Sequence, residues 1–280
     1  MTVVDAHHHL WDLSVRDQDW IAADSPLRRN FTPADLVPRA AAAGVDRTVL
    51  VQTVTVPEET PEFLALAAAH ELVAGVVGWT DLTRPDVAGE LARLRALPGG
   101  SHLKGIRHQV QGEPDPKWLL RPDVHRGLTA VAEAGLVYDL VVLPHQLPAC
   151  VEAAEALPRL TFVLDHLGKP PIASGALEPW ATDVRALAAL PNTVCKLSGM
   201  VTEADLASWT FDDLRPYADT VLDAFGPDRV MFGSDWPVCT LGATYGEVLD
   251  IARRLTPEST HARIFGATAT RVYGLDAPGS

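Results

Sequence analysis

The sequence is poor in cysteine. Its 280 residues include three cysteines, Cys150, Cys195 and Cys239, an odd number at widely spaced positions. Such a set does not form the disulfide framework of a small secreted protein, and a chain of this length buries enough apolar surface to fold without one. Scattered free thiols are typical of a reducing compartment, so we expect a cytoplasmic location.

Positive charge is also scarce. Lys plus Arg number 23 and Asp plus Glu number 36, which gives a net charge of −13 at pH 7. Because nucleic acids and anionic membranes are bound through basic patches, we expect neither as a partner. No apolar run approaches the roughly 20 residues of a membrane span, and no signal-peptide pattern opens the sequence. The expected partner is a small molecule, and the sequence leaves the oligomeric state open.

What the sequence does contain is an alternation of short apolar runs with Ala- and Leu-rich segments of helical spacing. Several runs are continuously apolar, as in strands that are buried on both faces of a parallel sheet. The predicted strands are 2–7, 47–54, 72–79, 103–108, 136–142, 160–165, 193–197 and 229–233. The predicted helices are 32–43, 61–70, 87–97, 123–134, 147–156, 179–189, 214–225, 245–255 and 257–265.

This alternation predicts one closed (β/α)8 barrel, or TIM barrel, as a single domain over residues 1–280. The segment 32–43 shows how clearly some boundaries are marked. It has Thr32 as N-cap, Pro33 at the first helical position and Gly44 as terminator. The alternative architecture is an open doubly wound sheet. It is disfavoured because no G-x-G-x-x-G or P-loop follows the first strand.

The first predicted strand ends in Asp5-Ala6-His7-His8-His9. Side chains two apart on a strand face the same way, so the rings of His7 and His9 reach one point and His8 points away. Paired imidazoles suit zinc or another divalent transition metal. The alternative interpretation is a polar strand end with chance histidines. We expect Asp5 to orient a neighbouring imidazole.

His166 and Asp235 follow the sixth and eighth predicted strands. Taken singly, His166 is more typical of a loop hydrogen bond and Asp235 of a helix cap. A barrel gathers the carboxyl ends of its strands around one opening, so we expect both residues to share a site with His7 and His9. An aspartate there can ligate a metal or accept a proton from water.

Three longer stretches accompany these residues: GIRHQVQGEPDPKWL from Gly105, LDHLGKP from Leu164 and MFGSDWPVC from Met231. Together with Asp5-x-His7-x-His9 they resemble the amidohydrolase superfamily, and within it the amidohydrolase-2 (amidohydrolase-related) branch that contains sugar lactonases. The resemblance covers essentially the whole chain. The H-x-H pair alone is a weak motif, whereas the ordered set of stretches is specific. It implies a hydrolase that opens a lactone ring of the L-fuconolactone or L-rhamnonolactone type.

The sequence also departs from the superfamily pattern. Fuller metal sites in that superfamily use a His at the end of strand five, where this chain has Tyr138 and Asp139. This departure from the pattern disfavours a two-metal site. It leaves two alternatives open: one divalent ion, such as Zn²⁺, or a metal-free site. The candidate metal ligands are His7, His9, Asp235 and His166.

We expect Asp235 to act as the general base for water, with His166 as the second catalytic residue. Polyhydroxylated rings are held by mixed polar and aromatic groups. The expected substrate contacts are Gln52, Arg107, His108, Lys196 and Trp236. For Arg107 and Lys196 the alternative is a salt bridge within the barrel, and for Trp236 it is packing beneath a loop.

A neutral sugar lactone is favoured over a dicarboxylate, because only Arg107, Lys104 and Lys196 offer cations at predicted strand ends. Two other functions stay open. One is a metal-dependent decarboxylase of an aromatic acid on the same barrel, and the other is a barrel that binds a ligand without catalysis.

Overall fold

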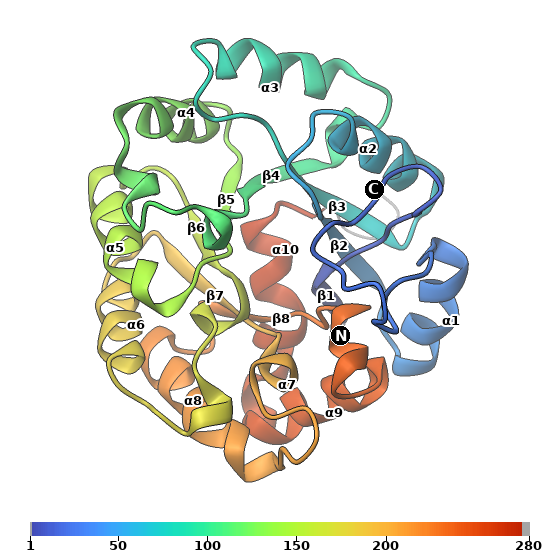
Figure 1. Cartoon of the computed structure of the whole chain (residues 1–280), viewed down its shortest axis with the longest axis vertical. Helices are drawn as coiled ribbons and strands as arrows, with labels where there is room; N and C mark the ends of the chain where they lie inside the picture. Colours follow the sequence, from blue (N-terminus) through green and yellow to red (C-terminus); the bar gives the residue numbers. More distant parts are fainter. Residues whose placement is uncertain (1, 276–280) are drawn as a thin grey trace.

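The computed structural model describes residues 2–275, so residue 1 and residues 276–280 of the expected domain lie outside the described part. Eight parallel strands form one sheet in the order of the chain, and helices surround it (Figure 1). The strands are β1 (Val4–His8), β2 (Arg47–Val51), β3 (Val73–Gly78), β4 (Leu103–His108), β5 (Val137–Leu140), β6 (Phe162–Leu164), β7 (Thr193–Leu197) and β8 (Val230–Phe232). The predicted (β/α)8 barrel is confirmed, and the open sheet is excluded.

The barrel closes where β1 meets β8. His8 and Trp236 form a parallel bridge across this seam. The N–H of His9 donates to the carbonyl oxygen of Trp236 at 2.7 Å, and the N–H of Asp235 donates to that of His7 at 2.8 Å. Backbone hydrogen bonds thus hold the polar end of the first strand beside the polar end of the last.

The helices are α1 (Pro33–Ala43), α2 (Glu59–Ala69), α3 (Val87–Ala96), α4 (Pro122–Glu133), α5 (Leu147–Ala156), α6 (Trp180–Ala188), α7 (Met200–Glu203), α8 (Phe211–Phe225), α9 (Tyr245–Leu255) and α10 (Thr268–Val272). Within residues 2–275 the helices other than α7 and α10 match the prediction to within a few residues at their ends. At the start of α1, the side chain of Asp35 accepts a hydrogen bond from the N–H of Thr32 at 2.9 Å, and Gly44 ends the helix at φ 69°. None of the helices within residues 2–275 has the length and apolarity that a membrane crossing requires.

The prediction was wrong at the end of the chain and missed two short helices, α7 and α10. Instead of one helix over 257–265, the chain forms a 3₁₀ turn at Glu258–Thr260, a π-helical segment at Arg263–Ala267 and then α10. Gly266 looks like a helix breaker in the sequence. In the structure it allows close approach, because a Cβ there would lie 2.2 Å from the carbonyl oxygen of Thr2.

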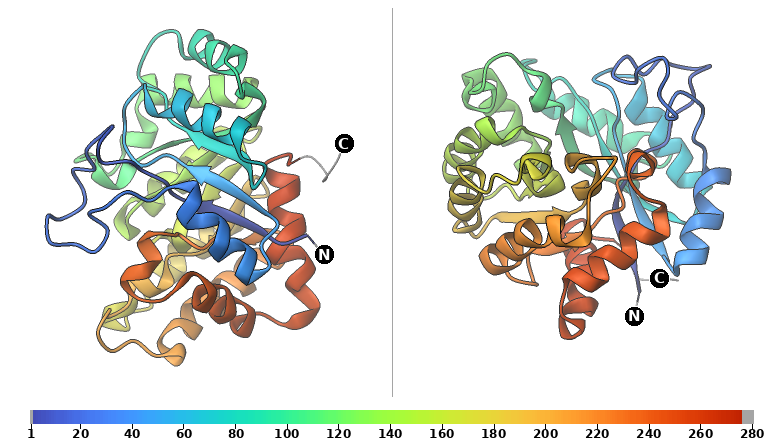
Figure 2. Two further views of the ribbon diagram at one scale, coloured as in Figure 1. Left: turned by 90° about the vertical axis from the view of Figure 1, so that its right-hand side faces the viewer. Right: turned by 60° about the horizontal axis from the view of Figure 1, so that its bottom comes forward.

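The barrel interior has two layers. The lower layer, called here the apolar floor, consists of Val4, Ala6, Val49, Val51, Val77, Val137, Val163, Val194 and Met231, with Ala269, Tyr273 and Leu275 packed against it. Above it lies the charged layer, which consists of Arg107, Asp139, Asp165 and Lys196, each at most 3% exposed. In the left view of Figure 2, α10 (red) lies at the end of the barrel where β1 begins, and the long segment between β1 and α1 (dark blue) lies at the opposite end.

Candidate active site

A β-bulge in β1 directs its histidines into the barrel. Asp5 pairs with Thr48 and His8 pairs with Leu50, so Ala6 and His7 together oppose one residue of β2. Strict alternation is broken there, and the side chains of both Ala6 and His7 face the interior. The expectation for Asp5 was therefore wrong.

The carboxylate of Asp5 contacts no imidazole. It accepts hydrogen bonds from the Ser234 hydroxyl at 2.6 Å and the Tyr245 hydroxyl at 2.9 Å. It also accepts from the backbone N–H groups of His7 at 3.1 Å and Ser234 at 2.8 Å. Asp5 thus fixes the backbone on both sides of the seam. The ring of His8 points away from the site, as expected, and lies 2.9 Å from the Thr48 hydroxyl.

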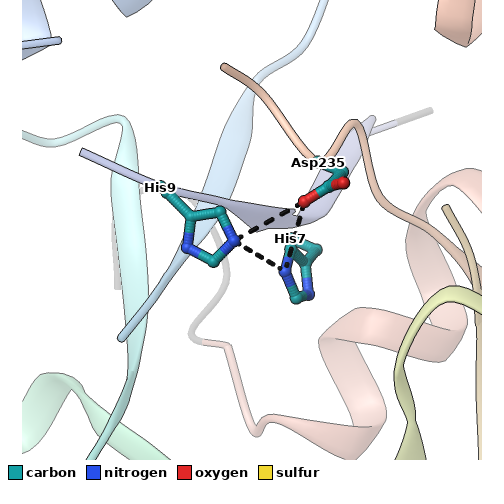
Figure 3. A group of neighbouring side chains, drawn as sticks. All are labelled: His7, His9 and Asp235. Atoms are coloured by element: carbon teal, nitrogen blue, oxygen red, sulfur yellow. Dashed lines mark hydrogen bonds and ion pairs between the residues drawn. The ribbon is translucent and has the colours of Figure 1, made fainter. Parts of the chain in front are cut away.

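The four expected ligands converge (Figure 3 shows three of them). The Nε2 atoms of His7 and His9 lie 3.1 Å apart. Oδ1 of Asp235 lies 3.7 Å from Nε2 of His7, 3.5 Å from that of His9 and 3.8 Å from that of His166. Residues from the ends of β1, β6 and β8 thus meet around one small volume.

This donor set fits a divalent metal ion. Nδ1 of His9 lies 2.8 Å from the carbonyl oxygen of Val51, which can only accept, so the neutral ring carries its proton on Nδ1 and presents a lone pair on Nε2. Tetrahedral zinc with bonds of about 2.0–2.1 Å separates its ligand atoms by about 3.4 Å. The distances of 3.1, 3.5 and 3.7 Å among His7, His9 and Asp235 bracket that value.

The backbone at the ends of β6 and β8 is left-handed. Within residues 2–275, His166, Leu167, Lys169 and Asp235 are the non-glycine residues with positive φ, at 54°, 56°, 53° and 55°. Such a conformation costs roughly 1–2 kcal/mol per residue. Gly168, at φ 72°, completes a turn of four successive left-handed residues. Strain of this kind is typical of functional sites.

The ring of His166 is held on two sides. Its Nδ1 lies 2.9 Å from the Ser198 hydroxyl. A Cβ at Gly199 would lie 2.7 Å from the ring, so glycine is required there. Burial lowers the pKa of His166 to about 4, against the opposing pull of Asp235, so the ring is neutral at pH 7.

Asp235 is ionised at neutral pH. Burial favours its neutral form, but the rings of His166 and His9 outweigh burial and hold the pKa of the carboxyl below its ordinary value. The pKa of His7 lies well below the ordinary value of histidine, because the ring is buried and faces the Lys196 ammonium. The site thus presents one carboxylate beside the neutral rings of His7 and His166.

The charged layer lies directly below these rings. Nζ of Lys196 is 2.6 Å from Asp139, 3.0 Å from Asp165 and 3.0 Å from Nδ1 of His7. Lys196 is fully buried. The structure therefore supports the salt bridge for Lys196, and the expected substrate contact was wrong, because three partners already surround its ammonium group.

Arg107 forms the salt bridge that the sequence left open as an alternative, and its expected substrate contact stays a prediction. Its Nη1 donates to Asp165 at 2.9 Å and its Nε donates to Oε1 of Gln52 at 2.8 Å. The same side chain also lines the cavity described below. Gln52 itself is fully buried beneath the arginine and does not line the cavity, so its expected substrate contact was wrong.

His108 and Trp236 were also expected to contact substrate, and neither lines the cavity. The ring of His108 is stacked on Trp118 at 4.2 Å, and its Nε2 lies 2.7 Å from Glu113. Trp236 is fully buried and packs edge-on against Phe31 at 5.4 Å. The structure supports loop packing for Trp236, whereas the side chain of His108 is 13% exposed and its expected substrate contact stays a prediction.

A cavity of about 260 Å³ opens over the converging residues. Its lining comprises His9, Trp20, Thr53, Arg107, Gln109, Gln111, Val141, His166, Lys169, Thr202, Glu203, Asp235 and Val238. Sequence reasoning missed most of its polar wall. Lys169 and the two glutamines lie inside the stretches that carried the family resemblance, which was a usable signal. Glu203 lies on α7, a helix that no pattern indicated.

Comparison with known proteins agrees with this geometry. A family model described as amidohydrolase matches residues 4–275. The chain belongs to the amidohydrolase family. This amidohydrolase is 38% identical to the L-fucono-1,5-lactonase of Burkholderia ambifaria over 98% of this chain and 96% of the relative. It is also 38% identical to the L-fucono-1,5-lactonase of Burkholderia multivorans, over 98% and 97% of the two chains.

A solved structure shows the same likeness in three dimensions. The crystal structure of an amidohydrolase from Burkholderia multivorans with bound zinc superimposes with a TM-score of 0.93 at 37% identity. The match covers 99% of this chain and 100% of that one. A relative with this overall fold thus binds zinc, and this amidohydrolase contains a donor set of suitable composition and spacing.

Proposed function

We propose that this amidohydrolase hydrolyses the lactone of a neutral sugar acid, of the L-fuconolactone or L-rhamnonolactone type. The observation that carries the proposal is the convergence of Asp235 with His7, His9 and His166 below a polar cavity. The full-length similarity to two L-fucono-1,5-lactonases supports the same reaction. The three buried free cysteines are consistent with a reducing, cytoplasmic location.

Asp235 acts as the general base. Its carboxylate takes a proton from a water molecule while the water oxygen bonds to the lactone carbonyl carbon. The bond between that carbon and the ring oxygen then breaks, and Asp235 returns the proton to the departing ring oxygen. The product is the open hydroxy acid. His166, whose Nε2 lies 3.8 Å from Oδ1 of Asp235, orients the carboxylate. The guanidinium of Arg107, which lines the cavity, offsets the negative charge that develops on the carbonyl oxygen.

We propose one divalent ion, of the zinc class, held by His7, His9 and Asp235 with His166 adjacent. When bound, it would supply a positive charge that polarises the lactone carbonyl. Metal analysis of the purified protein, followed by dialysis against a chelator and re-addition of Zn²⁺, tests this. Loss and recovery of turnover supports the ion, whereas full activity at substoichiometric metal supports the metal-free alternative.

The decisive variant is Asp235→Asn. It keeps the shape of the side chain and removes the base. We therefore expect turnover of L-fucono-, L-rhamnono- and galactono-lactones to fall about 10²–10⁴-fold. Turnover is measured by the protons that hydrolysis releases. An unchanged circular dichroism spectrum is the control for folding. Near wild-type turnover in this variant would contradict the role of Asp235.

The two other functions make different predictions. A decarboxylase of aromatic acids requires an apolar, aromatic-lined pocket, whereas Lys169, Glu203 and Gln111 give this cavity a polar wall. Release of carbon dioxide from hydroxybenzoates without lactone cleavage would favour that function. Ligand-dependent thermal shifts with no turnover of any lactone would favour a binding protein.

A further inference from the structure

The wall of the cavity contains an ion pair that the reaction above does not use. Nζ of Lys169 lies 3.5 Å from Oε1 of Glu203, and the two side chains are 22% and 25% exposed. Both line the cavity, beside Asp235 and His166. We propose that the Lys169–Glu203 pair determines the substrate class. It binds ring hydroxyls of a neutral lactone and excludes lactones that carry a free carboxylate. The inference rests on the proposed lactone hydrolysis.

The backbone holds Lys169 toward the reaction centre at a cost. Lys169 is the last residue of the left-handed turn that begins at His166, and its N–H donates to the His166 carbonyl oxygen at 2.8 Å. Both side chains line the cavity, and the Lys169 ammonium is close enough to lower the pKa of His166.

Glu203 reaches the cavity from α7, which follows Gly199 at φ 67°. Burial raises the pKa of Glu203 and the ammonium of Lys169 opposes this, so the carboxylate depends on its partner for charge balance. The negative charge of Asp235 is close enough to raise the pKa of Glu203 further. A ligand carboxylate placed here would face two protein carboxylates.

A third group in the cavity has an unused hydrogen-bonding atom. Oε1 of Gln111 is buried and accepts no hydrogen bond from any residue of the described chain. A buried acceptor without a partner is rare in folded proteins, and a ligand hydroxyl would satisfy it. The ammonium of Lys169 donates, and the carboxylate of Glu203 and the amide oxygen of Gln111 accept. This combination matches a ring that carries several hydroxyl groups.

The same wall disfavours anionic substrates, because each lysine or arginine that lines the cavity within residues 2–275 has an acidic partner. Arg107 is paired with Asp165 at 2.9 Å, and Lys169 is paired with Glu203. Glu203 therefore increases the affinity of the cavity for substrate hydroxyls and decreases its affinity for a free carboxylate on the substrate.

The test compares three lactones: L-fucono-1,5-lactone, an analogue that lacks one ring hydroxyl, and a lactone with an additional carboxylate. For Glu203→Gln, we expect kcat/KM for the hydroxylated lactone to fall about 10–100-fold, as for the loss of a hydrogen bond to a charged group. The deoxy analogue that lacks the bound hydroxyl should lose much less, and the anionic lactone should gain. Lys169→Met should also impair the neutral lactone but should reduce turnover of the anionic one.

Opposite effects of the two variants on the anionic lactone separate specificity from damage to the fold, because a damaged fold would lower both. The matched control is Glu178→Gln. Glu178 forms an ion pair with Arg185 at the same distance, 3.5 Å, but on the exposed surface. This variant should leave all three rates unchanged.

Equal losses on all three lactones in Glu203→Gln would overturn the inference and leave lactone hydrolysis intact. If the wild-type protein hydrolyses no lactone, the proposed function fails instead. The pair is then judged by calorimetric dissociation constants for the neutral and the anionic lactone, and equal constants in wild type and Glu203→Gln would overturn the inference as well.

Discussion

The apolar floor and the charged layer are neighbours inside one barrel and are stabilised in different ways. The floor consists mainly of valines, each of which contributes roughly 1.5–3 kcal/mol when it is removed from water. The charged layer is equally buried, and taking its ions out of water costs free energy that their attraction repays only with good geometry. The floor thus serves stability, whereas the charged layer is retained for what it holds in place.

The charged layer is balanced, with Arg107 and Lys196 opposite Asp139 and Asp165. The two carboxylates differ. Burial raises the pKa of Asp139 to about 6 in spite of Lys196. For Asp165, burial is outweighed by Lys196, His7 and Arg107, and its pKa lies well below the ordinary value. Asp165 is therefore the fixed anion of the layer, and it lies 3.4 Å from Nδ1 of His7.

Removal of one charge should have the largest effect on stability. Lys196→Met keeps the approximate shape of the side chain and leaves two buried carboxylates with one cation. We expect the free energy of unfolding to fall by about 3–5 kcal/mol, measured by urea titration. Turnover by the folded fraction should also fall, because the ring of His7 loses a neighbour at 3.0 Å.

The double variant Lys196→Met/Asp139→Asn is the control, because it removes one charge of each sign. It should be more stable than Lys196→Met alone. If Lys196→Met has the same free energy of unfolding as wild type, the charge balance of the charged layer does not affect stability, and the contrast with the apolar floor fails.

A smaller effect is expected at the boundary between the layers. The Tyr273 hydroxyl donates to Asp139 at 2.9 and 3.1 Å from below the barrel. Tyr273→Phe should cost about 1.5–3 kcal/mol, as for a hydrogen bond to a charged group, and should leave turnover unchanged.

The loss in Tyr273→Phe should depend on pH, because the hydrogen bond favours ionised Asp139. The folded pKa of this carboxyl is about 6, above the ordinary 3.8, and removal of the donor raises it further. The difference from wild type should therefore be present above about pH 6 and vanish as pH falls and Asp139 is protonated. Unfolding free energies that differ equally at pH 5 and pH 8 would contradict this assignment.

The smallest effect is expected in the floor. Met231→Leu conserves volume among fully buried neighbours and should cost less than about 1.5 kcal/mol, with unchanged turnover. Together with Lys196→Met it forms a matched pair, because each replaces one long side chain by another of similar size. A larger loss in Met231→Leu than in Lys196→Met would reverse the comparison between the layers.

The sequence predicted the barrel because its apolar runs and helical segments alternate, and the topology of a barrel then gathers His7, His9, His166 and Asp235. It did not predict which way the side chain of Asp5 points. A β-bulge shifts the strand register by one residue, and nothing in the sequence marks that shift. The sequence did not predict the left-handed turn after β6 either. Non-glycine residues rarely adopt this conformation, and His166 and Lys169 are not residues that indicate it.

Burial was the second source of error. Lys196 and Gln52 were expected to contact substrate because they are polar groups at predicted strand ends, and such groups hold polyhydroxylated rings. Such a side chain can lie above the histidine rings, in the cavity, or below them, in the charged layer. Its height along the barrel axis decides between the two, and the sequence pattern does not specify that height. Glu203 was missed for a different reason, because a helix as short as α7 has no periodicity to detect.

The contact between Tyr273 and Asp139 has a consequence for how the protein is made. During translation, β5 and its buried carboxylate emerge from the ribosome long before the hydroxyl that satisfies it. The seam between β1 and β8 also waits for the later part of the chain. A nascent barrel therefore exposes an open edge and a half-solvated interior until α10 has left the exit tunnel, and the barrel completes its polar contacts only after that point.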